Sequence, residues 1–164
     1  MILEENIISN EQSWKFVLPD DFQGTNIWNI CIKHSIAAGN WDENSPYDFQ
    51  LKHIKTIAIG DWIVAYLKRK TIGGIGRVIC TYDYQAANKK PEISDYFHGE
   101  FWHRIGVKWI PVTINIDVLS KSSQNPFRTP ITLLRIKKSV LEEILNNLNQ
   151  KELVALKVLL NKND

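Results

Sequence analysis

Short apolar runs of strand length, separated by turns, fill the middle of this chain and constrain its fold most. Alternating or β-branched segments of this kind predict strands at residues 13–18, 62–67, 72–82, 105–116 and 131–136. Consecutive strands lie close enough in sequence for antiparallel pairing. The sequence therefore predicts an α+β fold, in which a mixed, curved, barrel-like sheet of about five or six strands is flanked by helices at its openings.

One helix is expected between the first two of these strands. Gly24-Thr25 offers an N-cap, the helix covers about residues 26–37, and Gly39 ends it. Trp41 then lies just past the end of this helix, within loop chemistry. A second, short helix is expected over residues 47–55.

At 164 residues and 19.0 kDa, the chain has the size of one domain with a small helical tail. Apolar residues at helical spacing predict a helix from Val140 to about Asn161, and residues 146–150 interrupt it. We divide the chain into an N-terminal extension at residues 1–12, a domain at 13–149 and a C-terminal helix at 150–164. That helix would lead to a further domain if the protein is longer.

The net charge is only +2, but its distribution along the chain is uneven. Residues 1–50 carry two Lys against eight Asp or Glu, whereas residues 51–110 carry ten Lys or Arg against five acids. Residues 111–164 add eight basic side chains against five acidic ones. The basic centre and tail either form one surface that faces phosphates or are an ordinary solvated face, and the charge pattern favours neither.

A cytoplasmic location is expected. No apolar run approaches the roughly 20 residues that a membrane helix needs, so no membrane partner is predicted. The first residues lack the basic region and the long apolar core of a signal peptide. Cys31 and Cys80 each fall inside an apolar periodic segment, which predicts buried free thiols in a reducing compartment.

Catalytic and metal-binding patterns are lacking in the sequence. The glycine-rich run at residues 73–76 has no following Lys-Ser/Thr and lies inside a strand pattern, so it favours a bulge or tight sheet curvature over a nucleotide loop. Asp20-Asp21 is typical of a turn, and no nucleophile elbow or paired-carboxylate motif accompanies it. The histidines never pair at a zinc-ligand spacing. We expect no metal, no cofactor and no catalysis by this domain.

Six tryptophans are many for such a chain, and they fall into two groups. Those within expected strands or the first helix are predicted to lie in the core: Trp14, Trp28, Trp62 and Trp109. Trp41 and Trp102 instead stand in or beside loops, where a ring buries less surface. They serve either as packing residues or as walls of a slot for a flat ligand such as a base, and the residues alone leave both interpretations open.

Several short motifs, taken in order, resemble a known family. They are Trp14-Lys15-Phe16-Val17, Gly39-Asn40-Trp41, the run from Ile59 to Tyr66, the run from Ile72 to Val78, and the run from Trp102 to Ile110. Together they resemble the EVE domains of the PUA-like superfamily, which are relatives of the YTH readers of methylated adenine. The resemblance spans about residues 13–145 and is greatest to N-terminal domains of McrB-type, modification-dependent restriction proteins.

The resemblance implies a small mixed barrel that binds a nucleic-acid base turned out of its stack. It implies that Trp41 is one wall of an aromatic cage, and that the second wall comes from Tyr96, Phe97 or Trp102. Contacts to the base edge are implied for Asp20, Asn26 and Asn40. Phosphate contacts would come from these basic side chains: Lys68, Arg69, Lys70, Lys89, Lys90 and Arg104. Because Gly39-Asn40-Trp41 stands where Gly-Trp is common in the family, the modification that is read stays open.

The function implied is DNA targeting in a McrBC-type restriction system, with a modified base as ligand. An AAA+ motor domain, which would be a GTPase, and a nuclease subunit would then lie outside this chain. The alternatives are an RNA-binding domain, or a module for a small ligand or a protein on a barrel of the same type. Binding that weakens with salt would favour nucleic acid, because phosphate contacts release counterions.

Overall fold

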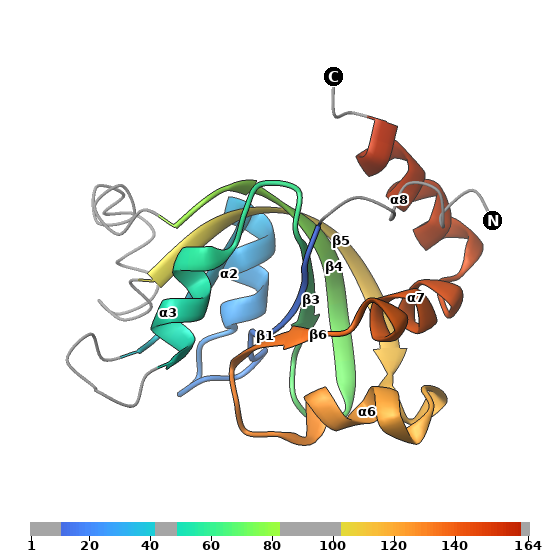
Figure 1. Ribbon diagram of the computed structural model, residues 1–164, viewed down its shortest axis with the longest axis horizontal. Helices are drawn as coiled ribbons and strands as arrows, with labels where there is room; N and C mark the ends of the chain where they lie inside the picture. The colour runs from blue at the N-terminus through green and yellow to red at the C-terminus, as the bar shows by residue number, and fades with distance from the viewer. Residues whose placement is uncertain (1–10, 42–48, 83–102, 162–164) are drawn as a thin grey trace.

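The computed structural model describes residues 11–41, 49–82 and 103–161, and six strands of this part form one sheet. The strands are β1 (Ser13–Val17), β2 (Ile36–Gly39), β3 (Trp62–Tyr66), β4 (Thr71–Cys80), β5 (His103–Asn115) and β6 (Leu133–Ile136). The helices are α2 (Ile27–His34), α3 (Phe49–Thr56), α6 (Lys121–Arg128), α7 (Lys138–Asn146) and α8 (Gln150–Asn161), with a 3-10 turn η1 (Ile116–Val118). The strand order is β2-β5-β4-β3-β1-β6, and the sheet curls into a half-barrel (Figure 1).

Helices cover both sides of the sheet, and each side has its own apolar core (Figure 1). Helices α2 and α3 lie on one side, where Trp14 and Phe16 of β1 point into the first core. Helices α6, α7 and α8 lie over the other, where Trp62 and Val64 of β3 join the second core. The predicted α+β fold with a curved, helix-flanked sheet is confirmed. In the described part of the chain, no helix is long and apolar enough to cross a bilayer.

The pairing of the strands was predicted in part. The meander β3-β4-β5 is antiparallel, as expected from the short connections. β1 instead pairs parallel with β3, because α2, β2 and α3 lie between them along the chain and carry it back to the same end of the sheet. β6 then pairs antiparallel with the other edge of β1. The first strand is therefore held between two strands that follow it much later.

The predicted end of the first helix is wrong. Helix α2 stops at His34, where Ser35 takes a left-handed conformation with φ 53° and donates its N–H to carbonyls of the last turn. The next four residues, which include the helix-favouring Ala37 and Ala38, form strand β2 and pair with His103–Gly106 of β5. This long-range pairing buries all four of them and overrides the local helical preference. The N-cap is Asn26, rather than the expected Gly24-Thr25.

The glycines of β4 permit close packing as well as the bulge that the sequence predicted. A Cβ atom on Gly74 would come within 2.3 Å of the Trp28 ring, so the indole of α2 lies directly on the strand. The strand register shifts between Ile72 and Gly74, which confirms the expected bulge. Cys31 is a buried free thiol, as predicted, but Cys80 is exposed because it lies at the end of β4, beyond the cover of the helices.

Three of the four tryptophans predicted to lie in the core are buried: Trp14, Trp28 and Trp62. Trp109 is only partly buried, because it stands on β5 and packs edge-on against the Trp28 ring. Its indole N–H donates to the Ile36 carbonyl at 2.8 Å, which ties β5 to the start of β2. Trp14, Trp28 and Trp109 therefore contribute to the first core, Trp62 contributes to the second, and Trp109 also holds the β2–β5 edge together.

Candidate nucleic-acid interface

Trp41 lies two residues beyond the end of strand β2 and packs back against the sheet. Its ring lies over Gly39, where an added Cβ atom would come within 2.4 Å of the indole. The ring centroid is 5.7 Å from that of Phe16 on β1, and the indole is partly buried against the first core. The glycine two residues earlier thus makes room for the ring. Trp41 is a fixed surface at the end of β2, rather than a free loop residue.

His103, the first residue of β5, holds Trp41 in place through its side chain. Nε2 lies 2.8 Å from the Trp41 carbonyl oxygen, and the two rings stack with centroids 5.8 Å apart and planes at 28°. Nδ1 lies 3.0 Å from the Tyr82 hydroxyl. Because a carbonyl oxygen only accepts, Nε2 donates to Trp41, and in the neutral ring Nδ1 accepts from Tyr82. His103 is only 2% exposed, so these contacts are shielded from water.

Arg104 and Cys31 lie in the interior beside this site. Arg104 is 5% exposed, and burial lowers the pKa of its guanidinium, while the nearby Cys31 opposes that change. Burial raises the pKa of the Cys31 thiol to about 12, so Cys31 stays protonated at neutral pH and is no nucleophile. Arg104 was predicted as a phosphate contact. It is buried, whereas the basic residues 68–70 of the hairpin are exposed.

Two of the predicted base-edge residues are engaged in local contacts. Asp20 forms an ion pair with Arg69 at 2.8 Å. The side chain of Asn26 accepts from the Asn29 backbone N–H at 2.9 Å, as the N-cap of α2. Asn40 is exposed between Gly39 and Trp41, next to the ring that would stack on a base. Of the three, Asn40 lies nearest to Trp41 along the chain, and all three base-edge contacts stay predictions.

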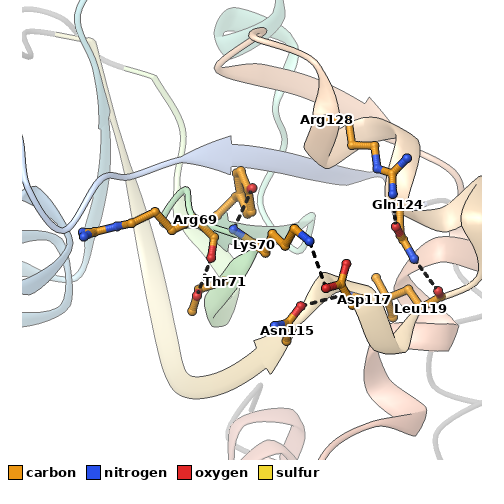
Figure 2. Close-up of polar contacts among 9 residues, drawn as sticks. Arg69, Lys70, Thr71, Asn115, Asp117, Leu119, Gln124 and Arg128 are labelled. Carbon is orange, nitrogen blue, oxygen red and sulfur yellow. Dashed lines mark hydrogen bonds and ion pairs between the residues drawn. The ribbon is translucent and has the colours of Figure 1, made fainter.

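The predicted phosphate contacts of the β3–β4 hairpin are exposed but partly neutralised. Lys68, Arg69 and Lys70 all have positive φ values, of 73°, 48° and 62°, and all three are exposed at the tip. Lys70 forms an ion pair with Asp117 at 3.1 Å, and the Asp117 N–H is in turn held by the Asn115 side chain (Figure 2). With Arg69 paired to Asp20, a phosphate would have to compete for two of these three cations. The other predicted site residues lie outside the described part: Lys89, Lys90, Tyr96, Phe97 and Trp102.

The structure adds a basic cleft that the sequence analysis did not single out. Two adjoining hollows, each of about 410 Å³, share Arg135, Ile136 and Lys137 at the junction of β6 and α7. Lys138 lines the first of them, beside Gln12 and Ser13 at the start of β1. None of these three cations forms an ion pair with a carboxylate in the described part of the chain. The only signal in the sequence was the run Arg135-Ile136-Lys137-Lys138. Its three cations were counted in the basic total of residues 111–164 but were not recognised as a site.

Solved structures show what this fold is similar to. The YTH domain of Zygosaccharomyces rouxii MRB1, in complex with N6-methyladenosine RNA, has a TM-score of 0.59 at 9% identity, over 84% of this chain and 86% of that one. Human THYN1, in complex with 5-methylcytosine containing DNA, has a TM-score of 0.54 at 10% identity, over 83% and 96%. ASCH from Zymomonas mobilis has a TM-score of 0.51 at 17% identity, over 85% and 97%.

No protein-family model matches the chain, and no curated protein matches it. Sequence identities of 9% to 17% establish a shared fold and nothing finer. The similarity covers more than four-fifths of the chain and includes two proteins solved with a methylated nucleic acid. The expected fold, a mixed, curved sheet flanked by helices, is therefore shared with these solved structures.

Proposed function

We propose that this chain is a nucleic-acid-binding domain that takes up an extruded, modified base against Trp41. The observation that carries the proposal is the fixed, partly exposed indole at the end of β2, stacked on His103 and backed by Phe16. The shared fold with a YTH domain solved with N6-methyladenosine RNA and with THYN1 solved with 5-methylcytosine DNA supports it. The domain itself carries out no catalysis in this proposal.

The energetics require more than one ring. Stacking on one aromatic side chain stabilises a base by about 1–3 kcal/mol, while extrusion from a duplex costs a few kcal/mol. Trp41 alone would therefore not offset extrusion, and we assign the second wall to Tyr96, Phe97 or Trp102. A buried methyl group adds about 0.8 kcal/mol, which biases binding toward a methylated base without making the selection absolute.

The remaining affinity would come from the basic cleft at β6 and α7. Strand β1 connects the two places, since Phe16 contacts the Trp41 ring and Ser13 lines the cleft. Phe16 and Ser13 lie three residues apart, about 10 Å along the extended strand. One nucleic-acid strand could thus place a base at Trp41 and a neighbouring phosphate at Arg135 or Lys137. We assign the main phosphate path to this cleft, because its cations form no ion pair with a carboxylate of the described residues, and a secondary one to the β3–β4 hairpin.

The finer proposal is that the domain targets DNA for a McrBC-type, modification-dependent restriction system. It is supported by the order of short motifs from Trp14 to Ile110. The GTPase motor and the nuclease would then belong to other domains or chains. The isolated chain should accordingly neither cleave nucleic acid nor hydrolyse ATP or GTP, with or without divalent metal. Turnover that persists through repurification and disappears in an Asp20→Asn variant would contradict the non-catalytic assignment.

A binding comparison tests the proposal. Labelled oligonucleotides with one 5-methylcytosine, 5-hydroxymethylcytosine, N6-methyladenine or no modification are titrated as DNA duplexes, and N6-methyladenosine RNA is titrated alongside. We expect a preference for one modified strand, and a loss of about 1–3 kcal/mol in Trp41→Ala. Because Trp41 also packs on Phe16, affinity is measured well below the melting temperature of the variant. Phe49→Ala is the matched control, since it removes another exposed ring, on α3.

The outcomes separate the candidate functions. A preference for methylated DNA supports the restriction role, and a preference for the RNA supports an RNA reader on the same barrel. Affinity that is unchanged in Trp41→Ala would remove this residue from the interface. Complete lack of binding at low salt, where phosphate contacts are strongest, would refute nucleic-acid recognition and leave a module for a small ligand or a protein.

A further inference from the structure

Four rings stand in contact at the edge where β2 meets β5. Phe16, Trp41, His103 and Tyr82 follow one another with centroid separations of 5.7, 5.8 and 5.9 Å. The Trp41–His103 and His103–Tyr82 pairs are stacked, with planes at 28° and 22°. Within this series only the imidazole also forms side-chain hydrogen bonds to both neighbours. His103 is thus the junction of the series.

The bond from His103 to Trp41 continues the strand pairing beyond the point where it stops. The last pair of the β2–β5 ladder is Gly39 with His103 itself. Two residues beyond Gly39, the carbonyl of Trp41 accepts a hydrogen bond from the side chain of the same histidine. One residue therefore fixes the backbone of Trp41 by a hydrogen bond and its indole by stacking.

We propose that His103 is a positioning residue that sets the orientation of Trp41 for base contact. That the ligand is a base rests on the proposed function. The position needs a flat group that donates at one end, accepts at the other and stacks. Neutral imidazole with the proton on Nε2 meets all three needs. The Trp41 carbonyl fixes that tautomer, because it can only accept from Nε2, and the Tyr82 hydroxyl then donates to Nδ1. A ring held in this way is ordered before ligand arrives, which reduces the entropic cost of binding.

Three substitutions at His103 separate the hydrogen bond from the packing. In His103→Gln, the side-chain amide can reach the place of Nε2 and donate to the Trp41 carbonyl. In His103→Asn, the shorter amide can replace only Nδ1. In His103→Leu, a similar volume stays and both hydrogen bonds are lost. The Gln and Asn variants carry the same functional group and differ in reach, so they form a matched pair.

Three readouts are needed, and two of them are independent of any ligand. Acrylamide quenching reports the accessibility of Trp41 once the signal of the Trp41→Phe variant is subtracted in each background. Nitrogen NMR of the imidazoles reports the tautomer of His103, with His103→Gln used to assign its signals. Affinity is measured with the 5-methylcytosine duplex and the N6-methyladenosine RNA.

We expect His103→Leu and His103→Asn to increase the quenching of Trp41 and to weaken binding about five- to tenfold, the equivalent of roughly one hydrogen bond. His103→Gln should return the quenching of Trp41 and the affinity for the oligonucleotides close to their wild-type values. If His103→Leu fails to fold, the Gln and Asn pair still decides. Quenching that is equal in all variants, or a Gln variant as impaired as the Asn variant, would overturn the inference. If wild type binds neither oligonucleotide, the proposed function fails, whereas quenching and tautomer still test the positioning of Trp41.

Discussion

Replacement of the buried lysine of β1 by methionine should stabilise the protein at neutral pH. Lys15 is fully buried, and its ammonium donates to the Pro126 carbonyl at 2.9 Å and lies 3.4 Å from the Thr129 hydroxyl, at the end of α6. In the described part of the chain, no carboxylate forms an ion pair with it. Burial lowers the pKa of Lys15 from 10.5 to about 8, which means that the fold opposes its charged form.

The size of the effect follows from that shift. A difference of this size corresponds to an upper limit of about 3 kcal/mol of destabilisation whenever Lys15 is charged. Lys15→Met removes this cost but also removes the hydrogen bonds to α6, which contribute roughly 1 kcal/mol net. The Pro126 carbonyl keeps the Thr129 hydroxyl as a donor at 3.2 Å, so it is not left unpaired. We therefore expect a net gain of about 2 kcal/mol at pH 7.

The change of wild-type stability with pH, measured relative to Lys15→Met, tests this explanation. Between pH 8 and 10.5 the folded chain has released the Lys15 proton while the unfolded chain keeps it, so the unfolded state binds more protons. Wild-type stability should therefore rise through this window relative to Lys15→Met, and the gap should close. Denaturant unfolding at pH 7 and pH 10 measures both values, with the exposed Lys121→Met as control. A Lys15→Met variant that is less stable at pH 7, by an amount unchanged at pH 10, would refute the reasoning.

Three further outcomes are expected. Gly39→Ala should displace the Trp41 ring and weaken binding about as much as Trp41→Ala does, because the new Cβ atom would come within 2.4 Å of the indole; unchanged affinity would mean that the ring can shift without loss. Reversal of Arg135, Lys137 and Lys138 to Glu should flatten the salt dependence of binding more than reversal of residues 68–70, and the opposite ranking would move the phosphate path to the hairpin. Glu143→Gln should lower the melting temperature at pH 7, because contacts from Ser123 and Ser120 lower the pKa of this carboxyl; the stabilisation is lost as pH falls through that lowered pKa, so melting curves of both proteins should converge in acid below pH 4.5.

Five of the six strands of the described part were predicted because their signal is local, whereas β2 was not. Alternation of apolar residues, and turns at Gly60-Asp61 and Lys68-Arg69-Lys70, place β3 and β4 within a residue or two. Helix α6 was not foreseen, because residues 121–128 contain Pro126 and lack an apolar repeat. Its first turn is also capped from a distance, since Ser120 and Ser123 contact Glu143 of α7. A cap supplied from another helix leaves no trace in local spacing.

Of the residues at the candidate site, the sequence singled out Trp41 but did not indicate the role of His103 or the burial of Arg104. Trp41 stood out because loop chemistry surrounds it in the sequence. His103 was rejected as a metal ligand and given no other role, because its partners, Trp41 and Tyr82, lie 62 and 21 residues away along the chain. The burial of Arg104 depends on the pairing of β2 with β5, which the helical appearance of Ala37-Ala38 concealed.

The position of β1 between β3 and β6 has a consequence for how the chain can be made and cut. Its partners lie about fifty and about 120 residues downstream, so most of its pairing closes long loops, which slows folding. A nascent chain released only as far as residue 130 contains α6 but lacks β6, so one edge of β1 would be left open. Expression of the first 130 residues alone should therefore yield an aggregating fragment, even though every ring around Trp41 would be present in it.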